Sequence, residues 1–183
     1  YSDAGHQEQH LDIYLPDMKY HSSELSQRYS NAPDYFTNAC ATISEMIRQV
    51  NTPVFVPMNT SISESDFSSL PLSEQSEQGL MKKGVIVRHL ILPGHTKDSK
   101  EILKYLHTTY GNQIFVSIMN QYTPLQEMQS QTDYPDLSRT LTKREYEKVL
   151  EYALLLSMEQ VFIQGTETAK ESFIPPFDFE GII

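Results

Sequence analysis

The stretch Gly84–Leu92, which reads GVIVRHLIL, is the strongest indication of the fold in this chain. Its apolar residues are nearly continuous, which is typical of a parallel strand with both faces covered. Shorter apolar runs at Leu11–Pro16, Val54–Val56, Gln113–Asn120 and Val161–Gln164 are separated by stretches with helical spacing. This alternation predicts βα units around a parallel sheet flanked by helices, and therefore an α/β fold.

Three longer helices are predicted from local signals. Residues 36–50 carry apolar side chains at helical spacing after Pro33, and a second helix should begin near Lys97–Ser99 and end before Gly111. A third should begin at Thr142-Lys-Arg-Glu145, because this capping-box pattern satisfies backbone donors at a helix start.

Three stretches are predicted to be irregular. Residues 58–79 are rich in serine and acidic side chains and lack Lys and Arg, so we expect a flexible surface loop without chemistry of its own. Residues 121–137 should form a loop after a strand, where active sites of barrels are built. Residues 174–183 should form a C-terminal strap held by phenylalanines. No linker divides the chain, so residues 1–183 are expected to belong to one domain.

Composition limits the classes of function. The formal net charge of -10 argues against nucleic acid as a partner, because phosphate binding needs clustered Lys and Arg. No apolar run approaches the roughly 20 residues of a membrane span, and the first ten residues lack the features of a signal peptide. Cys40 is the single cysteine, which excludes a disulfide framework or a thiolate metal site within the chain and makes the cytoplasm the expected location.

Two strands carry charged residues that are candidates for a binding site. Asp17 and Lys19 are two residues apart and should project to the same side at a strand end, as a ligand site or as a plain exposed ion pair. Arg88 lies within the apolar strand, where a guanidinium needs a carboxylate or phosphate partner, either a ligand or a structural partner on a neighbouring strand. His89 should point the opposite way and pack in the core.

A third candidate is the segment Asn120–Tyr122 at the end of the strand QIFVSIMN. Its amides and aromatic ring would suit an adenine or a peptide backbone, and an ordinary strand-end turn is the alternative. The six histidines show no metal-ligand spacing, and Cys40 lies on an apolar-spaced helix, as expected for a core cysteine. No metal site and no catalytic residue can be assigned within the chain.

The order of several phrases resembles one family. In this order, several phrases of the chain resemble the C-terminal half of radical S-adenosylmethionine proteins related to pyruvate formate-lyase activating enzymes. They are LDIYLPDMKY, RYSNAPDYFTNACATISEMIRQV, GLMKKGVIVRHLILPGHTKDS, VSIMNQYTP and IPPFDFEGI. The resemblance implies the later part of a partial (β/α) barrel. It also implies reductive cleavage of S-adenosylmethionine to a 5′-deoxyadenosyl radical, which abstracts hydrogen. The implied substrate is a glycyl-radical enzyme or another protein, and the implied reductant is a protein such as flavodoxin or ferredoxin.

The resemblance also assigns cofactor-binding residues. Asp17 and Lys19 match a D-x-K element whose lysine faces the methionine moiety, and Arg88 matches an arginine that contacts the bound cofactor. Asn120 and Gln121 fall at the ligand-binding strand end, and Tyr122 stands where the activating enzymes have a histidine.

One departure from the family is large. The chain has no CxxxCxxC motif, so the ligands of the implied [4Fe–4S] cluster are expected outside it, in an upstream segment preceding Tyr1. The alternative is a non-catalytic relative or binding module that has lost the iron–sulfur site. As a fragment, the chain is expected to be inactive alone and to associate with itself through the strand edge beside Leu11–Pro16.

Overall fold

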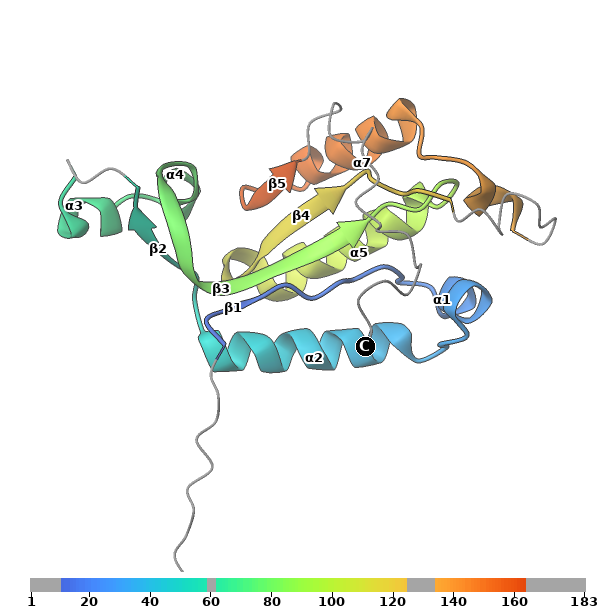
Figure 1. Cartoon of the computed structure of the whole chain (residues 1–183), viewed down its shortest axis with the longest axis horizontal. Coiled ribbons are helices and arrows are strands. Elements are labelled where there is room, and N and C mark those ends of the chain that lie inside the picture. Colours follow the sequence, from blue (N-terminus) through green and yellow to red (C-terminus); the bar gives the residue numbers. More distant parts are fainter. Residues whose placement is uncertain (1–10, 59–61, 125–133, 164–183) are drawn as a thin grey trace, which may run out of the picture.

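The computed structural model describes residues 11–58, 62–124 and 134–163 of the chain (Figure 1). Helices and strands alternate along most of this length, as the apolar pattern predicts. In chain order the elements are β1 (Ile13–Tyr14), α1 (Ser23–Ser30), α2 (Tyr35–Val50), β2 (Val54–Pro57), α3 (Glu64–Ser68), α4 (Leu72–Gln78), β3 (Gly79–Leu90), α5 (Thr96–Tyr110), η1 (Gly111–Gln113), β4 (Phe115–Met119), η2 (Pro135–Ser138), α7 (Lys143–Leu155) and β5 (Val161–Ile163).

The strands form a parallel sheet in the order β1-β3-β4-β5, which confirms an α/β fold with helices against a parallel sheet. β2 adds to this sheet by pairing antiparallel with the first half of β3. The parallel strands therefore follow one another in space in the same order as in the sequence. Each crossover moves one strand further in the same direction, and right-handed crossovers then place the connecting helices on one face.

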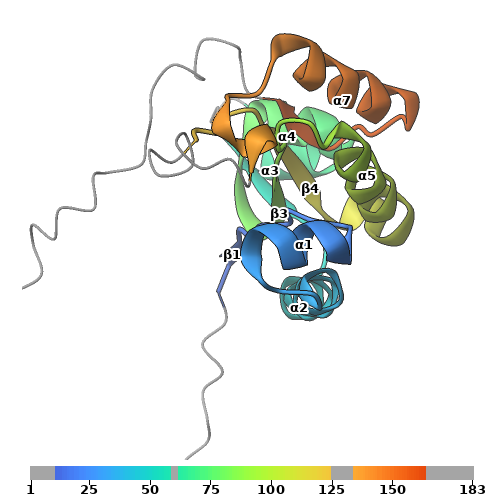
Figure 2. The same ribbon diagram turned by 90° about the vertical axis from the view of Figure 1, so that its right-hand side faces the viewer.

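The main core lies between that face and the three long helices. It joins residues of α2, α5 and α7 to the alternate residues of β3 and β4, and Figure 2 shows α2, α5 and α7 surrounding the strands from one side. The strand residues in this core include Val85, Val87 and Ile91 of the β3 segment and Val116 and Ile118 of β4. The alternation of a strand places the intervening residues on the opposite face.

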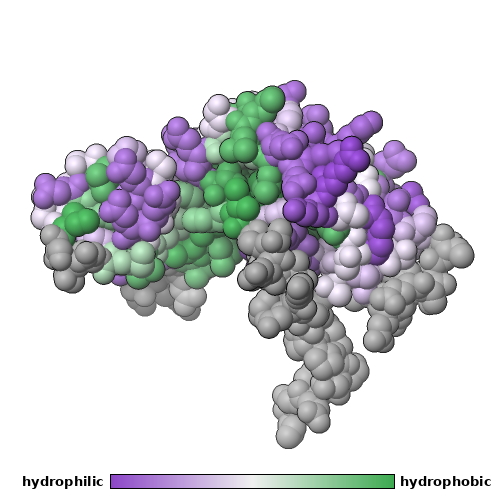
Figure 3. Space-filling model, turned by 90° about the horizontal axis from the view of Figure 1, so that it is seen from above, coloured by the Kyte–Doolittle hydropathy of each residue, from purple (hydrophilic) through white to green (hydrophobic). Residues whose placement is uncertain are grey.

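We call that opposite side the open face, although Phe67 of α3 covers the part of it around Phe115. In the middle of it, strand register places Ile86, Arg88 and Leu90 of β3 next to Phe115, Ser117 and Met119 of β4. Phe162 of β5 lies at one side, and Ile13, Leu15 and Asp17 of β1 and the segment after it lie at the other. The side chains nearest the sheet edges are exposed, 53% for Leu15 and 36% for Phe162. Exposed apolar residues also occur at the end of α7 and on β5, and seen from above hydrophobic residues form a band over the middle of the molecule (Figure 3).

Residues 62–79 differ from the irregular loop expected from their composition. They form α3 and α4, and Phe67 is buried against Phe55 and Phe115 in a second, smaller core. The serines and acidic residues that suggested a loop act locally instead. Ser63 accepts a hydrogen bond from the Asp66 backbone N–H at the start of α3, which is a typical N-cap.

Other boundaries also differ from the sequence expectations. β3 begins at Gly79 rather than Gly84, because its first residues pair with β2, and the helix α1 was not anticipated. The helices α2, α5 and α7 are confirmed, and Thr142 and Glu145 form the predicted capping box at the start of α7. The expected strap at 174–183 lies outside the described residues, as do residues 125–133. In the described parts of the chain, no helix has the length and apolar character needed to cross a membrane.

Candidate functional site

The carboxyl ends of the parallel strands meet at one edge of the sheet, and three predicted site segments lie there. Asp17 pairs with Arg88 through a parallel bridge just beyond β1, and Arg88 is in register with Ser117 of β4. Side chains from three separate segments therefore stand side by side on the open face. In parallel α/β sheets this is the edge where ligands bind.

Asp17 and Arg88 form an ion pair. Arg88 Nη2 lies 2.7 Å from Asp17 Oδ1, and both side chains are about two-fifths exposed, 42% and 41%. Arg88 therefore has a carboxylate on the neighbouring strand as its partner, which was one of the two possibilities left open by the sequence. The pair engages one nitrogen of the guanidinium, and the buried Nε has no hydrogen-bond partner among the described residues. Donors of the planar fork thus remain for a second acceptor.

Lys19 follows Asp17 on the same side of the extended segment, and its backbone position is fixed. The Lys19 N–H donates to the Tyr35 hydroxyl at 2.9 Å, and the same hydroxyl donates to the Asp17 carbonyl oxygen at 3.0 Å. A single tyrosine from the first turn of α2 therefore contacts the backbone of both predicted site residues.

The segment after β1 is held at further points by more distant elements. The Met18 N–H donates to the Arg88 carbonyl at 2.9 Å. The Asp98 carboxylate, in the first turn of α5, accepts the backbone N–H groups of His21 and Ser22 at 2.9 and 2.8 Å. These contacts give the strand end a defined shape, although only Ile13–Tyr14 is regular strand.

His89 lies on the core side of β3, opposite to Arg88, as expected. Its Nδ1 is 2.7 Å from the Met18 carbonyl oxygen, and because a carbonyl can only accept, Nδ1 carries the hydrogen. The ring is 1% exposed, and Nε2 has no partner among the described residues. Burial lowers the pKa of His89, so the ring is neutral and serves to position the strand end.

The segment Asn120–Tyr122 is divided between two roles. Tyr122 donates its hydroxyl to the Leu137 carbonyl at 2.8 Å and packs with Tyr20 and Leu92, so it holds the chain after β4, and burial raises its pKa. Asn120 follows the alternation of the core-facing residues of β4, and its buried Oδ1 has no partner among the described residues. Gln121 follows the alternation of Arg88 and is partly buried. The structure therefore brings Asp17 and Arg88 into contact, but not Tyr122 with either.

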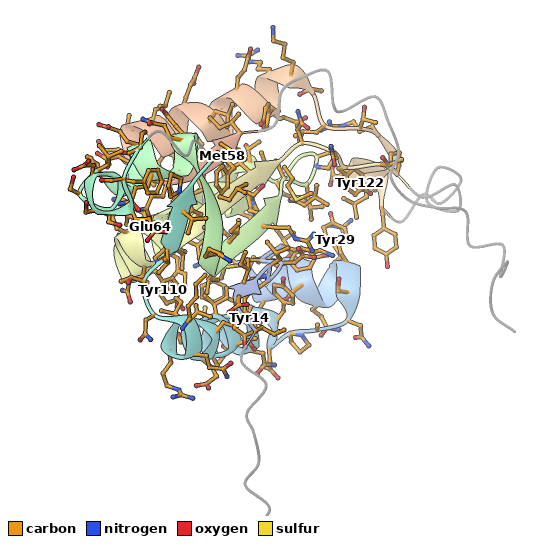
Figure 4. All side chains as sticks on the ribbon, turned by 60° about the vertical axis from the view of Figure 1, so that its left-hand side comes forward. Tyr14, Tyr29, Met58, Glu64, Tyr110 and Tyr122 are labelled. Atoms are coloured by element: carbon orange, nitrogen blue, oxygen red, sulfur yellow. The ribbon has the colours of Figure 1, made fainter. Side chains whose placement is uncertain are left out.

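Sequence reasoning missed several residues at this edge. Tyr35 and Asp98 act on backbone groups far away in the sequence, and no local pattern marks them. Tyr29 is 2.8 Å from His95 Nε2 and belongs to the same cluster of aromatic residues as Tyr122, at the end of the molecule where Figure 4 labels both. Burial raises the pKa of Tyr29.

A cavity of about 560 Å³ adjoins the ion pair on the other side of the strand end. It lies between the segment after β1 and the part of α2 up to Met46. Asp17 and Tyr35 line it together with Asn38, Thr42 and Met46. Asp17 is therefore accessible both from the open face and from this cavity.

The described residues contain no group of three or more His, Cys, Asp or Glu that could hold a metal ion. Cys40 lies on α2 and packs partly against the main core, and burial raises the pKa of its thiol. A thiol that is harder to ionise is a poor metal ligand and a poor nucleophile. The residues that the structure describes therefore do not fit an iron–sulfur cluster.

Comparison with known proteins gives a likeness to a protein of undetermined role. No model of a known protein family matches the chain, and no solved structure matches it. An uncharacterized protein of Methanocaldococcus jannaschii is 26% identical over 153 residues, which cover 83% of this chain and 34% of that relative. The chain thus spans about a third of the length of the relative that it matches, and the likeness carries no activity with it.

Proposed function

We propose that this chain forms later βα units of a radical S-adenosylmethionine enzyme related to pyruvate formate-lyase activating enzymes. In this proposal, the carboxyl end of the open face binds S-adenosylmethionine. The observation that carries the proposal is the half-exposed Asp17–Arg88 pair at the carboxyl end of a parallel sheet whose strands follow in chain order. The family resemblance of the sequence supplies the specific cofactor.

The winding of the sheet supports a partial barrel. In doubly wound sheets the strand order reverses at a switch point and helices cover both faces. In barrels the order is sequential, the helices lie outside, and the inner face carries the ligand site at the carboxyl ends of the strands. The order β1-β3-β4-β5, with α2, α5 and α7 in one core, agrees with the second arrangement. The exposed Leu15 and Phe162 would then face the interior of the complete barrel.

The charges at this edge suit S-adenosylmethionine. Its methionine part is a zwitterion with an added sulfonium, so it offers one carboxylate and two cationic centres. The free donors of Arg88 would bind the carboxylate, Asp17 would face a cationic centre, and the Lys19 ammonium would add a second donor to the carboxylate. Asn120 lies on the core-facing side of β4, so its buried Oδ1 is not offered to a ligand on the open face.

In this assignment the chain binds and orients the cofactor but does not hold the cluster. Bound S-adenosylmethionine would supply the 5′-deoxyadenosyl group that abstracts hydrogen from the substrate. The cluster ligands would come from residues outside these 183, because Cys40 is the single cysteine here. A glycyl-radical enzyme or other protein substrate, and a flavodoxin or ferredoxin as reductant, belong to the same proposal.

The test uses the full-length product of the gene, prepared without oxygen. Binding of S-adenosylmethionine is measured by calorimetry, and release of 5′-deoxyadenosine is measured after reduction with dithionite. Arg88→Met should weaken binding by at least about tenfold, the effect of losing a charged hydrogen bond. Arg48→Met is the matched control, because Arg48 is an exposed arginine on α2 paired with Glu45 at 2.6 Å. Wild-type protein that neither binds the cofactor nor releases 5′-deoxyadenosine would refute the proposal.

A second candidate is a non-catalytic relative that has kept the scaffold as a binding module. The lack of a metal-ligand group among the described residues is compatible with both candidates, and they differ in whether the cofactor is cleaved. Such a protein would bind S-adenosylmethionine or a similar zwitterion with the same dependence on Arg88. It would release no 5′-deoxyadenosine under any reducing conditions, so the two measurements above separate the candidates.

A further inference from the structure

We propose that Tyr35 is a positioning residue, whose hydroxyl blocks the outer edge of the described sheet beyond β1 and holds Asp17 and Lys19 in the conformation that meets the ligand. The ligand in this statement is the S-adenosylmethionine of the proposed function, on which the inference rests. Nothing in the motifs of the sequence assigns such a role to Tyr35.

The backbone directions at the end of β1 explain why the hydroxyl is placed there. The Pro16 carbonyl accepts the Arg88 N–H at 2.8 Å, and the Met18 N–H donates to the Arg88 carbonyl. Peptide groups of an extended chain alternate in direction, so the Asp17 carbonyl and the Lys19 N–H point away from β3. They face the side on which the described sheet ends, since β1 is its terminal strand.

Tyr35 satisfies both of these outward groups with one oxygen. It donates to the Asp17 carbonyl at 3.0 Å and accepts from the Lys19 N–H at 2.9 Å. A further strand added beside β1 could pair as far as the Asp17 N–H but not beyond, because the Asp17 carbonyl and the Lys19 N–H are already taken. The hydroxyl therefore stops strand pairing at the ion pair and keeps the carboxyl end accessible.

The tyrosine is itself held rigidly. Its ring packs edge-on against Tyr20, with ring centres 5.2 Å apart and an interplanar angle of 82°, in the cluster that includes Leu92 and Leu137. The ring also lines the cavity that reaches Asp17. The Asp17 carboxylate must stay where it meets Arg88 at 2.7 Å, and shifts of about 1 Å at a site are sufficient to lose most of a ligand's fit.

Tyr35→Phe removes the hydroxyl and keeps the ring. Tyr20→Phe is the matched control, since Tyr20 belongs to the same cluster but its hydroxyl bonds Ser30 Oγ at 2.9 Å instead of the strand end. Both variants of the full-length protein are compared with wild type by hydrogen exchange of the Lys19 amide and by calorimetry with S-adenosylmethionine. Tyr35→Phe should speed exchange and weaken binding by about tenfold each, the effect of one hydrogen bond. Tyr20→Phe should change either quantity less than about twofold.

Two results would overturn the inference while leaving the proposed function intact. One is that Tyr35→Phe binds S-adenosylmethionine and exchanges the Lys19 amide as wild type does, while Arg88→Met has lost its affinity. The other is an equal loss of affinity in Tyr20→Phe, which would mean general loosening of the cluster. Wild-type protein that does not bind S-adenosylmethionine refutes the proposed function, and the inference falls with it.

Discussion

Glu145 connects the start of α7 to the loop after β3, and its replacement tests how this edge of the sheet is held together. One oxygen of its carboxylate accepts the Gly94 N–H at 2.8 Å, and the Thr142 N–H and hydroxyl donate to the other at 2.9 and 2.7 Å. Arg139 adds two parallel bonds of 2.8 Å each. The Glu145 side chain is 15% exposed, so water replaces few of these contacts if they are lost.

Glu145→Gln should lower the free energy of unfolding by about 2 to 3 kcal/mol. The amide keeps one acceptor oxygen, but its NH₂ group faces donors from Arg139 or Thr142. Loss of a charged hydrogen bond costs roughly 1.5 to 3 kcal/mol, and loss of a helix cap costs about 1 kcal/mol. With a urea m-value of about 2 kcal/mol/M, the unfolding midpoint should fall by roughly 1 to 1.5 M.

The pH dependence gives a second readout. The Arg139 guanidinium, followed by the Thr142 and Gly94 donors, holds the pKa of Glu145 well below its usual range, against the opposing effect of burial. A carboxyl with a depressed folded pKa contributes its full stability above the unfolded pKa, about 4.3, and loses it as the pH falls toward the folded value. The difference between wild type and Glu145→Gln should therefore be constant near neutral pH and shrink below about pH 4.3.

Urea titrations followed by circular dichroism measure both effects, with Glu147→Gln as the control. Glu147 lies on the same helix, is half exposed, and pairs only loosely with Lys143 at 3.6 Å. Its replacement should cost less than about 0.5 kcal/mol. Equal midpoints for the two variants, or a difference that does not depend on pH, would refute this account of Glu145.

Two further variants test the two cores. Phe67→Ala should destabilise the protein by about 3 to 5 kcal/mol, because the 1% exposed ring fills the core between α3 and β4. Urea unfolding measures this loss, and it would show none if residues 62–79 were a loose loop. His89→Gln should remove a pH dependence. Burial lowers the pKa of His89 in the folded protein, so wild type should lose stability as the pH falls below the unfolded value of about 6.5. Thermal melts at several pH values should show a melting temperature that depends less on pH in the variant.

Features with a local cause could be predicted from the sequence. The period-two alternation correctly placed Arg88 and His89 on opposite faces of β3, and the capping box correctly marked the start of α7. Composition was less informative. Serine and acidic residues favour loops, but Ser63 caps α3, and the buried Phe67 docks that segment on the second core together with Ile62, Leu70 and Leu72.

The contacts of the candidate site could not be predicted, because they join residues that are far apart in the chain. Asp17 and Arg88 were each recognised as polar residues at strand positions, yet their pairing depends on the register of β1 with β3. Tyr35 and Asp98 act on backbone groups, which have no sequence signature. Asn120 and Tyr122 are neighbours in the sequence, but Tyr122 is used to pack the loop after β4. The roles of all these residues toward a ligand stay predictions.

The long-range hydrogen bonds that fix the segment after β1 have a consequence for the order of folding. His89 and Asp98, which fix the backbone of Met18 and His21, lie 71 and 77 residues further along the chain than their partners. Contacts of such long range form only after the intervening loop has closed, which slows their formation. As the chain is synthesised, the strand end with Asp17 and Lys19 must wait for β3 and α5 before it acquires its shape. The proposed ligand site is therefore complete only after β3 and the start of α5 have folded, and ligand binding would report on that step.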